Sequence, residues 1–152
     1  MSQAQRGSTL IEVLAASAII SLALTAASAM TAMSVKLAEN NERQQLALQK
    51  AEEALETVRR DRLLNQWPDF SVSYNQAASY CFNTLPQDLL ALSALSGACG
   101  EDEYLLVANY LFFRQIEVQS HGADALSVRV LMTWQDGNKD KQLELSQRFE
   151  NY

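Results

Sequence analysis

Few side chains in this sequence have the type and spacing that catalysis or metal binding needs. His121 is the only histidine, and it precedes Gly122 with no cysteine or carboxylate cluster beside it. This predicts neither a metal site nor a catalytic triad. Cys81 and Cys99 could be thiols or metal ligands, but they form no C-x-x-C pattern and no partner ligands accompany them. Because there is also no Gly-rich phosphate loop and no H-E-x-x-H, we expect no enzyme, no metal and no cofactor.

One carboxylate stands out by its position. Glu12 directly precedes residues 13–35, a run of 23 residues without a charged residue, Pro or Gly. As a helix this run spans about 35 Å, which is enough for the hydrocarbon core of a bilayer. A carboxylate beside such a run is costly, so we expect it to be functional. Arg6 and Gly7 come shortly before it, after a polar stretch at residues 1–5.

The stretch around Glu12 resembles the class III signal of type IV prepilins and type II secretion pseudopilins. It reads Gly7-Ser8-Thr9-Leu10-Ile11-Glu12-Val13-Leu14. In that family a prepilin peptidase cuts after the Gly on the cytoplasmic side of the membrane, and the new N-terminus is N-methylated. The resemblance implies cleavage between Gly7 and Ser8, methylation of Ser8, and an assembly role for Glu12. Ser8 departs from the Phe that usually stands there.

Two plainer interpretations of the apolar run are open. It could be a Sec signal peptide cut after Ala27-Ser28-Ala29, which fits an A-x-A site, or a simple membrane anchor. A carboxylate at Glu12 serves neither purpose, and the helical pattern continues through the supposed cleavage site. The prepilin interpretation is therefore favoured.

Length and charge restrict the remaining functions. The 152 residues suit one domain plus the apolar segment, and the net charge is −6. An acidic chain without a basic cluster argues against nucleic acid as a partner. The nearest exception, Arg59-Arg60-Asp61-Arg62, is interpreted as a solvated helix end.

The helical pattern does not stop at residue 35. Neither Gly nor Pro occurs between Gly7 and Pro68, which predicts one helix over residues 8–62, ended by Trp67-Pro68. Part of one helical stripe is apolar and is expected to pack on a globular head: Leu48, Ala51, Leu55 and Val58. The predicted division is a leader at 1–7, a transmembrane and assembly helix at 8–35, an amphipathic upper helix at 36–67 that is part of the head, and the C-terminal globular head with its sheet at 68–152.

The first part of the head is predicted from short patterns. Residues 70–74 alternate and predict a short strand, whereas residues 86–97 predict a short helix with Pro86 in its first turn. Cys81 and Cys99 flank this helix. If the head is exported to an oxidising compartment, they are expected to form a disulfide.

The C-terminal third has the pattern of a sheet. A long run at 104–119 is followed by clear alternation at 126–134, turn residues at 136–140 and a last alternating strand at 143–149. Consecutive strands with short links favour an antiparallel meander. The expected fold class is α+β, with a long N-terminal α-helix packed against a small antiparallel β-sheet head.

Within the family, the head most resembles a PilV-type minor pilin. The resemblance rests on a strand ending in Val-x-Val-x-Met-x-Trp, a polar turn at Asp136-Gly137-Asn138 and a closing amphipathic strand. The apolar run also lacks the Pro of major pilins, with Ala29 in its place, which favours a minor subunit. The alternatives are an I-type minor pseudopilin of a type II secretion system and a minor pilin whose head is an adhesin. Acidic loops in pseudopilins sometimes hold Ca²⁺, but residues 101–103 are interpreted as a solvated loop.

The resemblance also implies partners and a location. These are other pilin or pseudopilin subunits, prepilin peptidase, the inner membrane and assembly platform proteins. The subunit would cross the inner membrane once, with a periplasmic head, and then enter a pilus or pseudopilus. Because subunits at the extreme tip of pseudopili lack the glutamate, Glu12 implies a position below another subunit.

Overall fold

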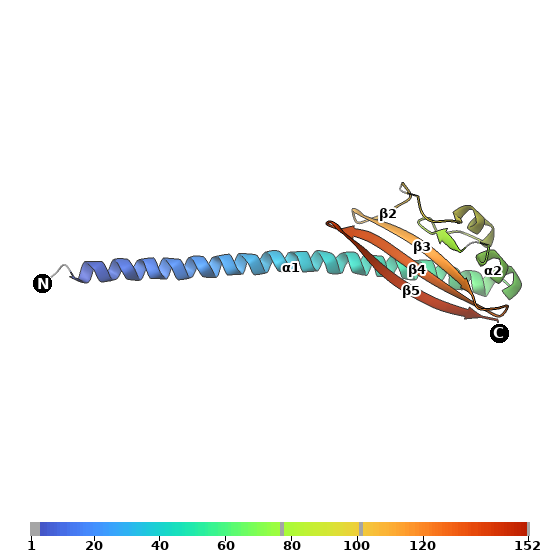
Figure 1. The fold of residues 1–152 in the computed structure, drawn as a ribbon, viewed down its shortest axis with the longest axis horizontal. Helices are drawn as coiled ribbons and strands as arrows, with labels where there is room; N and C mark the ends of the chain where they lie inside the picture. Colours follow the sequence, from blue (N-terminus) through green and yellow to red (C-terminus); the bar gives the residue numbers. More distant parts are fainter. Residues whose placement is uncertain (1–3, 77, 101, 152) are drawn as a thin grey trace. The chain divides into compact units, whose positions relative to one another are not determined.

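The chain divides into two compact units in this computed structural model, residues 1–41 and residues 42–152. The structure describes residues 4–76, 78–100 and 102–151. Helix α1 (Ala4–Leu64) supplies the described part of the first unit and the beginning of the second (Figure 1). We call residues 42–152 the head, so the head begins within α1, at Glu42.

Helix α1 has 61 residues, and its length follows from the sequence. No Pro and no Gly occur between Gly7 and Pro68. Every residue between them therefore keeps its backbone N–H, and none adds the conformational freedom of glycine that disfavours a helix. The continuous helix predicted over residues 8–62 is therefore confirmed. Its described part from Leu10 onwards is long and apolar enough to cross a membrane, with a mean hydropathy of 2.1 in an 18-residue window.

The head contains one antiparallel sheet, so the predicted α+β fold is confirmed. Its long strands are β3 (Tyr110–Ser120), β4 (Ala125–Asp136) and β5 (Lys139–Glu150), which pair in chain order. Two short strands, β1 (Ser79–Cys81) and β2 (Leu105–Val107), both pair with β3 on the side away from β4. The free edge of the meander is therefore β5 (Figure 1).

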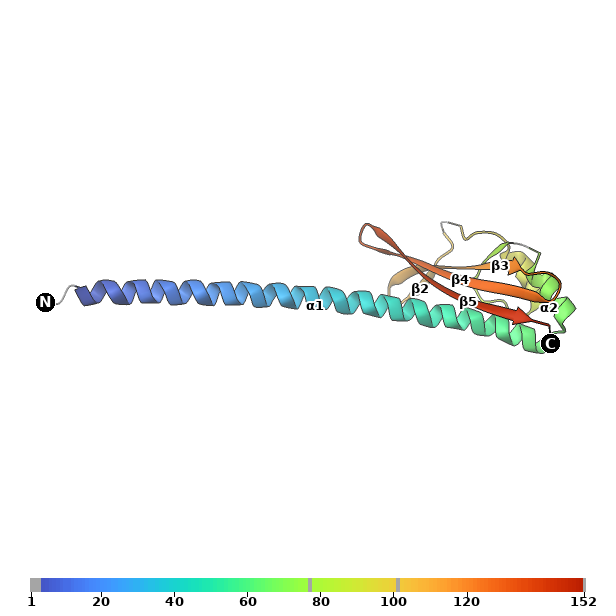
Figure 2. The same cartoon turned by 60° about the horizontal axis from the view of Figure 1, so that its bottom comes forward.

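The core lies between one face of this sheet and the C-terminal part of α1, which run alongside each other in Figures 1 and 2. Alternate residues of β4 point inward, from Leu126 to Trp134, as the period of a strand requires. On α1 the buried positions include three fully buried alanines, whose small side chains allow the sheet to approach closely: Ala47, Ala51, Ala54, Leu55 and Val58. Leu48 was expected among them but is 37% exposed, because the buried stripe runs through Ala47 instead.

Two predictions for the connecting segments are wrong. Residues 70–74 form no strand but part of helix α2 (Trp67–Tyr74), which has Pro68 in its first turn. The buried side chains of α2 are Trp67, Phe70 and Tyr74, spaced three and four apart, whereas Val72 is 64% exposed. This spacing is that of one helix face. Because the three aromatic side chains are buried on that face, the segment forms a helix although residues 70–74 also alternate as in a strand.

Two further elements of the head differ from their predicted length or type. The run at 104–119 is not one strand, because a turn at Ala108-Asn109 divides it into β2 and β3. The short helix expected at 86–97 is a 3₁₀ helix, η1 (Leu89–Leu95). Asp88 caps η1, since its carboxylate accepts a hydrogen bond from the Ala91 N–H at 3.0 Å.

The turn expected at residues 136–140 is confirmed and connects β4 to β5. Gly137 has a φ of 63°, a left-handed conformation that glycine adopts without steric cost. Asp136, at the end of β4, accepts a hydrogen bond from Arg43 at 3.0 Å, and the Arg43 guanidinium lies 4.6 Å from the centre of the Tyr110 ring. The β4–β5 turn is thus fixed to α1 where the head begins.

Candidate functional site

The apolar part of α1 is the largest candidate interaction surface in the first unit. Its big side chains are all exposed, between 54% and 78%, and they lie on every side of the helix. The residues are Leu10, Ile11, Val13, Leu14, Ile19, Ile20, Leu22, Leu24, Met30, Met33 and Val35. A helix that is apolar all round is stable only when lipid or other helices surround it.

The hydroxyl groups of this segment are compatible with such surroundings. All six Ser and Thr side chains between residues 13 and 35 donate a hydrogen bond to a carbonyl three or four residues earlier, at 2.8–2.9 Å: Ser17, Ser21, Thr25, Ser28, Thr31 and Ser34. No hydroxyl proton is therefore left without a partner if the segment enters an apolar environment.

The structure places the three predicted N-terminal site residues close together on α1. Gly7, Ser8 and Glu12 lie in its first turns, and the Glu12 side chain is exposed. Ser8 and Glu12 are four residues apart, which in a helix is about 6 Å along the axis and on one face. A free amine at Ser8 and the carboxylate of Glu12 would therefore form neighbouring opposite charges at one end of the apolar segment.

The two predicted cysteines are joined in the head. Cys81 ends β1, Cys99 follows η1, and their sulfurs are 2.12 Å apart. The amide of Asn83 lies against both sulfurs and also donates to the carbonyl of Glu103. The bond closes the loop that carries η1, and closing a loop of this length stabilises a fold by about 3 kcal/mol.

Sequence reasoning missed a buried arginine that organises this loop. Arg114 on β3 is 2% exposed and donates to three carbonyl oxygens, those of Phe82 at 2.6 Å, Lys50 at 2.9 Å and Asn83 at 3.3 Å. Glu53 is its nearest carboxylate, at 3.7 Å. Burial lowers the pKa of the guanidinium, and Glu53 partly opposes that shift. The side chain connects α1, β3 and the segment after β1, and no sequence pattern marks it.

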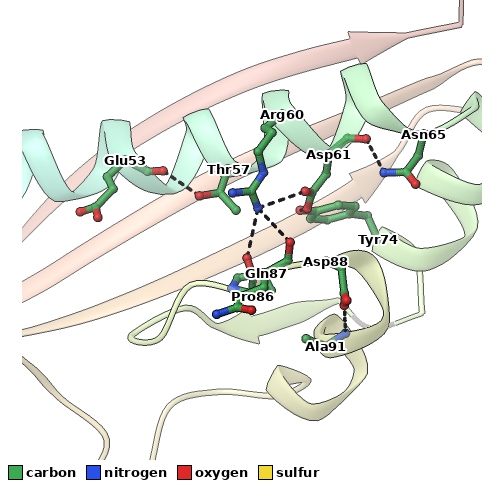
Figure 3. Close-up of polar contacts among 10 residues, drawn as sticks. All are labelled: Glu53, Thr57, Arg60, Asp61, Asn65, Tyr74, Pro86, Gln87, Asp88 and Ala91. Atoms are coloured by element: carbon green, nitrogen blue, oxygen red, sulfur yellow. Dashed lines mark hydrogen bonds and ion pairs between the residues drawn. The ribbon is translucent and has the colours of Figure 1, made fainter.

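A second buried polar cluster lies at the end of α1 (Figure 3). Asp61 is 2% exposed and accepts a hydrogen bond from the Tyr74 hydroxyl at 2.9 Å. Arg60 reaches the other oxygen of Asp61 at 3.4 Å and also donates to the carbonyls of Pro86 and Gln87. Both neighbouring arginines also have partners in the head, since Arg59 donates to the Gln147 side chain and Arg62 to the Glu150 carbonyl. The predicted solvated helix end is therefore wrong for Asp61 and holds for the arginines only in that Arg59 and Arg60 remain exposed.

The electrostatics of this cluster are dominated by desolvation. Burial raises the pKa of the Asp61 carboxyl above its ordinary value, although Tyr74 and Arg60 both favour the charged form. Burial also raises the pKa of Tyr74, and the neighbouring Asp61 charge adds to that shift. Asp61 therefore holds its negative charge at a cost, which its two donors reduce.

The remaining candidates are not brought together. Within the described residues, no group of three His, Cys, Asp or Glu side chains could hold a metal ion. Of the acidic run, Glu103 folds back to accept from the Gly100 N–H at 2.7 Å, Asp102 is exposed, and Glu101 lies outside the described residues. His121 makes a hydrogen bond with the Ser127 hydroxyl at 2.8 Å.

Comparison with known proteins gives one match. Residues 2–28 match the family model described as the prokaryotic N-terminal methylation motif. The matched range contains Gly7, Ser8 and Glu12 and the first half of the exposed apolar segment. Comparisons of the chain with curated proteins and with solved structures give no match.

Proposed function

We propose that this chain, which carries the class III signal of type IV prepilins in residues 2–28, is a minor pilin. In this role it is a structural subunit and not an enzyme; it is cleaved by prepilin peptidase and helps to initiate or modify a type IV pilus. The observation that carries the proposal is the methylation motif leading directly into a helix whose apolar side chains are exposed on every side.

Before assembly, residues 8–35 hold the subunit in the inner membrane with its head in the periplasm. The Cys81–Cys99 disulfide supports a periplasmic location of the head, because disulfides persist in oxidising compartments such as the periplasm. Assembly platform proteins then transfer the helix from lipid into a bundle with other pilin subunits. Both environments are apolar, so the transfer leaves the hydroxyl bonds of α1 intact.

Glu12 links processing to assembly. Bundling places its carboxylate in a medium of low dielectric constant, where an unpaired charge costs several kcal/mol. Cleavage after Gly7 creates an amine at Ser8, and the amine of a neighbouring subunit satisfies that charge. Because the uncut chain has no such amine, only processed subunits dock favourably.

The PilV-type assignment rests on the head and on the missing Pro in the apolar segment. Strand β4 with its Trp134, the turn at Gly137 and the amphipathic β5 are the features that support it. An I-type minor pseudopilin of a type II secretion system is the alternative, because pseudopilins carry the same N-terminal signal. Shearing whole cells separates the two, since a pilus subunit leaves with surface filaments and a pseudopilus subunit stays with the cells.

Cleavage is tested by mass spectrometry of the chain extracted from membranes. The expected N-terminus is Ser8, with an additional 14 Da, about the mass of one CH₂ unit, where it is methylated. A start at Met30 would instead identify a Sec signal peptide and reject the proposal. Gly7→Val is the matched variant, and it should remain uncut and absent from filaments.

A further inference from the structure

The free edge of the head sheet, strand β5, is the feature that the proposed function does not use. β5 has 12 residues and pairs with β4 along its whole length, and no described strand pairs with its other edge. The carbonyl of Glu150 on that edge accepts a hydrogen bond from Arg62 at 3.2 Å. In an antiparallel pair the bonded residues alternate, so every second residue of β5 turns its backbone groups outward. Those residues are Asp140, Gln142, Glu144, Ser146 and Arg148.

Next to this edge there is a hollow of about 570 Å³ between β5 and α1. On the β5 side it is lined by Leu145 and Ser146. On the α1 side it is lined by Gln49, Glu52, Glu53, Leu55, Glu56 and Arg59, which carry three negative charges and one positive charge. An open row of backbone groups beside a hollow is the arrangement that strand addition needs.

We propose that the β5 edge of the head binds an extended strand of a different filament subunit, one that carries Lys or Arg at alternate positions. This inference rests on the proposed function, because it identifies a partner within the filament. Strand addition satisfies the outward backbone groups of β5, and one row of the added side chains then faces α1 across the hollow.

Charge and spacing both select basic side chains for that row. Glu52 makes no ion pair within the described residues, and Glu56 pairs only with Arg59, at the surface. Glu52 and Glu56 are separated by about 6 Å along the helix, and alternate side chains of a strand by about 6.8 Å. Two basic side chains in one row therefore reach both carboxylates.

A second copy of this chain fits the edge poorly. Pairing β5 with another β5 around a two-fold axis makes the two strands antiparallel, so the parts of α1 that pack on the two heads also run in opposite directions, whereas subunits of the proposed filament all run in the same direction. The other edge of the described sheet offers only two strands of three residues each: β1, which is already bridged to Ser96, and β2, which is preceded by the acidic Asp102 and Glu103. Those carboxylates would meet the carboxylates of α1. The complementary partner is therefore a different chain.

The test uses the full chain in cells that assemble the filament. Ser146→Pro removes one outward N–H, a change that an edge strand tolerates, and Ser146→Thr is its control. Glu52→Lys replaces a carboxylate of the hollow by a positive charge and neutralises the net charge of the hollow, and Asp102→Lys makes the same substitution on an exposed loop. We expect about tenfold less Ser146→Pro and Glu52→Lys than wild type in sheared filaments, which corresponds to about 1.4 kcal/mol, while both controls stay within twofold.

Crosslinking tests the identity of the partner. Gln49→Cys places a free thiol in the hollow, because both native cysteines are bonded to each other. A short thiol–amine crosslinker should join it, in filaments, to a Lys of a different subunit within an alternating stretch, whereas Asp102→Cys should give no such product. A link to another copy of this chain, or none, overturns the proposal.

Different results would contradict the proposed function and the strand addition to β5. If wild type is not cut after Gly7 or does not enter filaments, the proposed function is wrong. If wild type is cut and incorporated, and Glu52→Lys is incorporated equally well, only the strand addition is wrong. Should Ser146→Pro fail to fold, Glu52→Lys and the crosslink still decide, because neither changes the backbone.

Discussion

Arg114 is the largest of the almost completely buried side chains described in the head, and its burial is balanced by hydrogen bonds to three carbonyls on two different segments. Arg114→Met keeps the volume but leaves these carbonyls without their donor. We expect a loss of about 3–5 kcal/mol in the free energy of unfolding. Urea unfolding of the full chain in detergent, followed by the fluorescence of Trp67 and Trp134, measures it. The control Arg129→Met removes an arginine that is 47% exposed and should cost less than about 1 kcal/mol.

Asp61 gives the head a pH dependence of its own. Because burial raises its pKa in the folded state, the folded chain holds this proton more tightly than the unfolded chain does. The Asp61 contribution to stability is therefore fully present below pH 3.8, the ordinary value, and is lost as pH rises through the raised pKa. Asp61→Asn has no charge to bury. Relative to this variant, wild type should become steadily more stable from pH 7 down to about 4; a constant difference would contradict the assignment.

Among the elements, the β2–β3 hairpin carries visible strain. Ala108 and Asn109 in its turn have φ values of 48° and 66°, in the left-handed region. The left-handed conformation costs an alanine about 1 kcal/mol of conformational free energy, and it costs an asparagine less. Ala108→Asn should thus raise the free energy of unfolding by about 0.5–1 kcal/mol, and Asn109→Ala should lower it by a similar amount. Thermal unfolding of both variants tests the pair, and equal melting temperatures would mean that the turn relaxes.

The elements also show which sequence patterns decide structure. β4 and β5 were predictable, because their alternation lasts for nine residues at 126–134 and seven at 143–149, and a glycine turn separates them. α2 was not recognised, because Phe70, Val72 and Tyr74 satisfy a strand period while Trp67, Phe70 and Tyr74 satisfy a helix period. The Pro at position 68 and the burial of Trp67 favour the helix, and the Pro was already visible in the sequence.

At the scale of the whole molecule, the proposed function gives Glu12 the role of connecting the apolar segment to assembly. If charge pairing drives docking, Glu12→Val should still be cleaved after Gly7 but should accumulate in the inner membrane. An anchor alone would tolerate Val, since Val is better suited to lipid. Quantifying the variant in sheared filaments and membranes, with Glu12→Asp as the conservative control, distinguishes the two roles. Normal incorporation of the Val variant would show that Glu12 does not drive docking here.

The candidate sites differ in how far the sequence could predict them. Gly7, Ser8 and Glu12 lie within six consecutive residues, so a local motif identifies them, and the family match covers the same residues. The Cys81–Cys99 pair was predictable because the chain has only two cysteines. The open β5 edge and its hollow were not, because they depend on how strands and helix meet across residues 49 to 148.

The back-bonded hydroxyls of α1 have a mechanical consequence. Each of the six hydroxyls donates to a backbone carbonyl that belongs to the hydrogen-bond pattern of the helix. The extra hydrogen bond weakens the backbone hydrogen bond at that carbonyl, so the helix bends there at little cost. They recur every three or four residues from Ser17 to Ser34, so compliance is spread along the segment and not gathered at one Pro kink. If such helices bundle in the proposed filament, we expect it to curve under load without a fixed hinge.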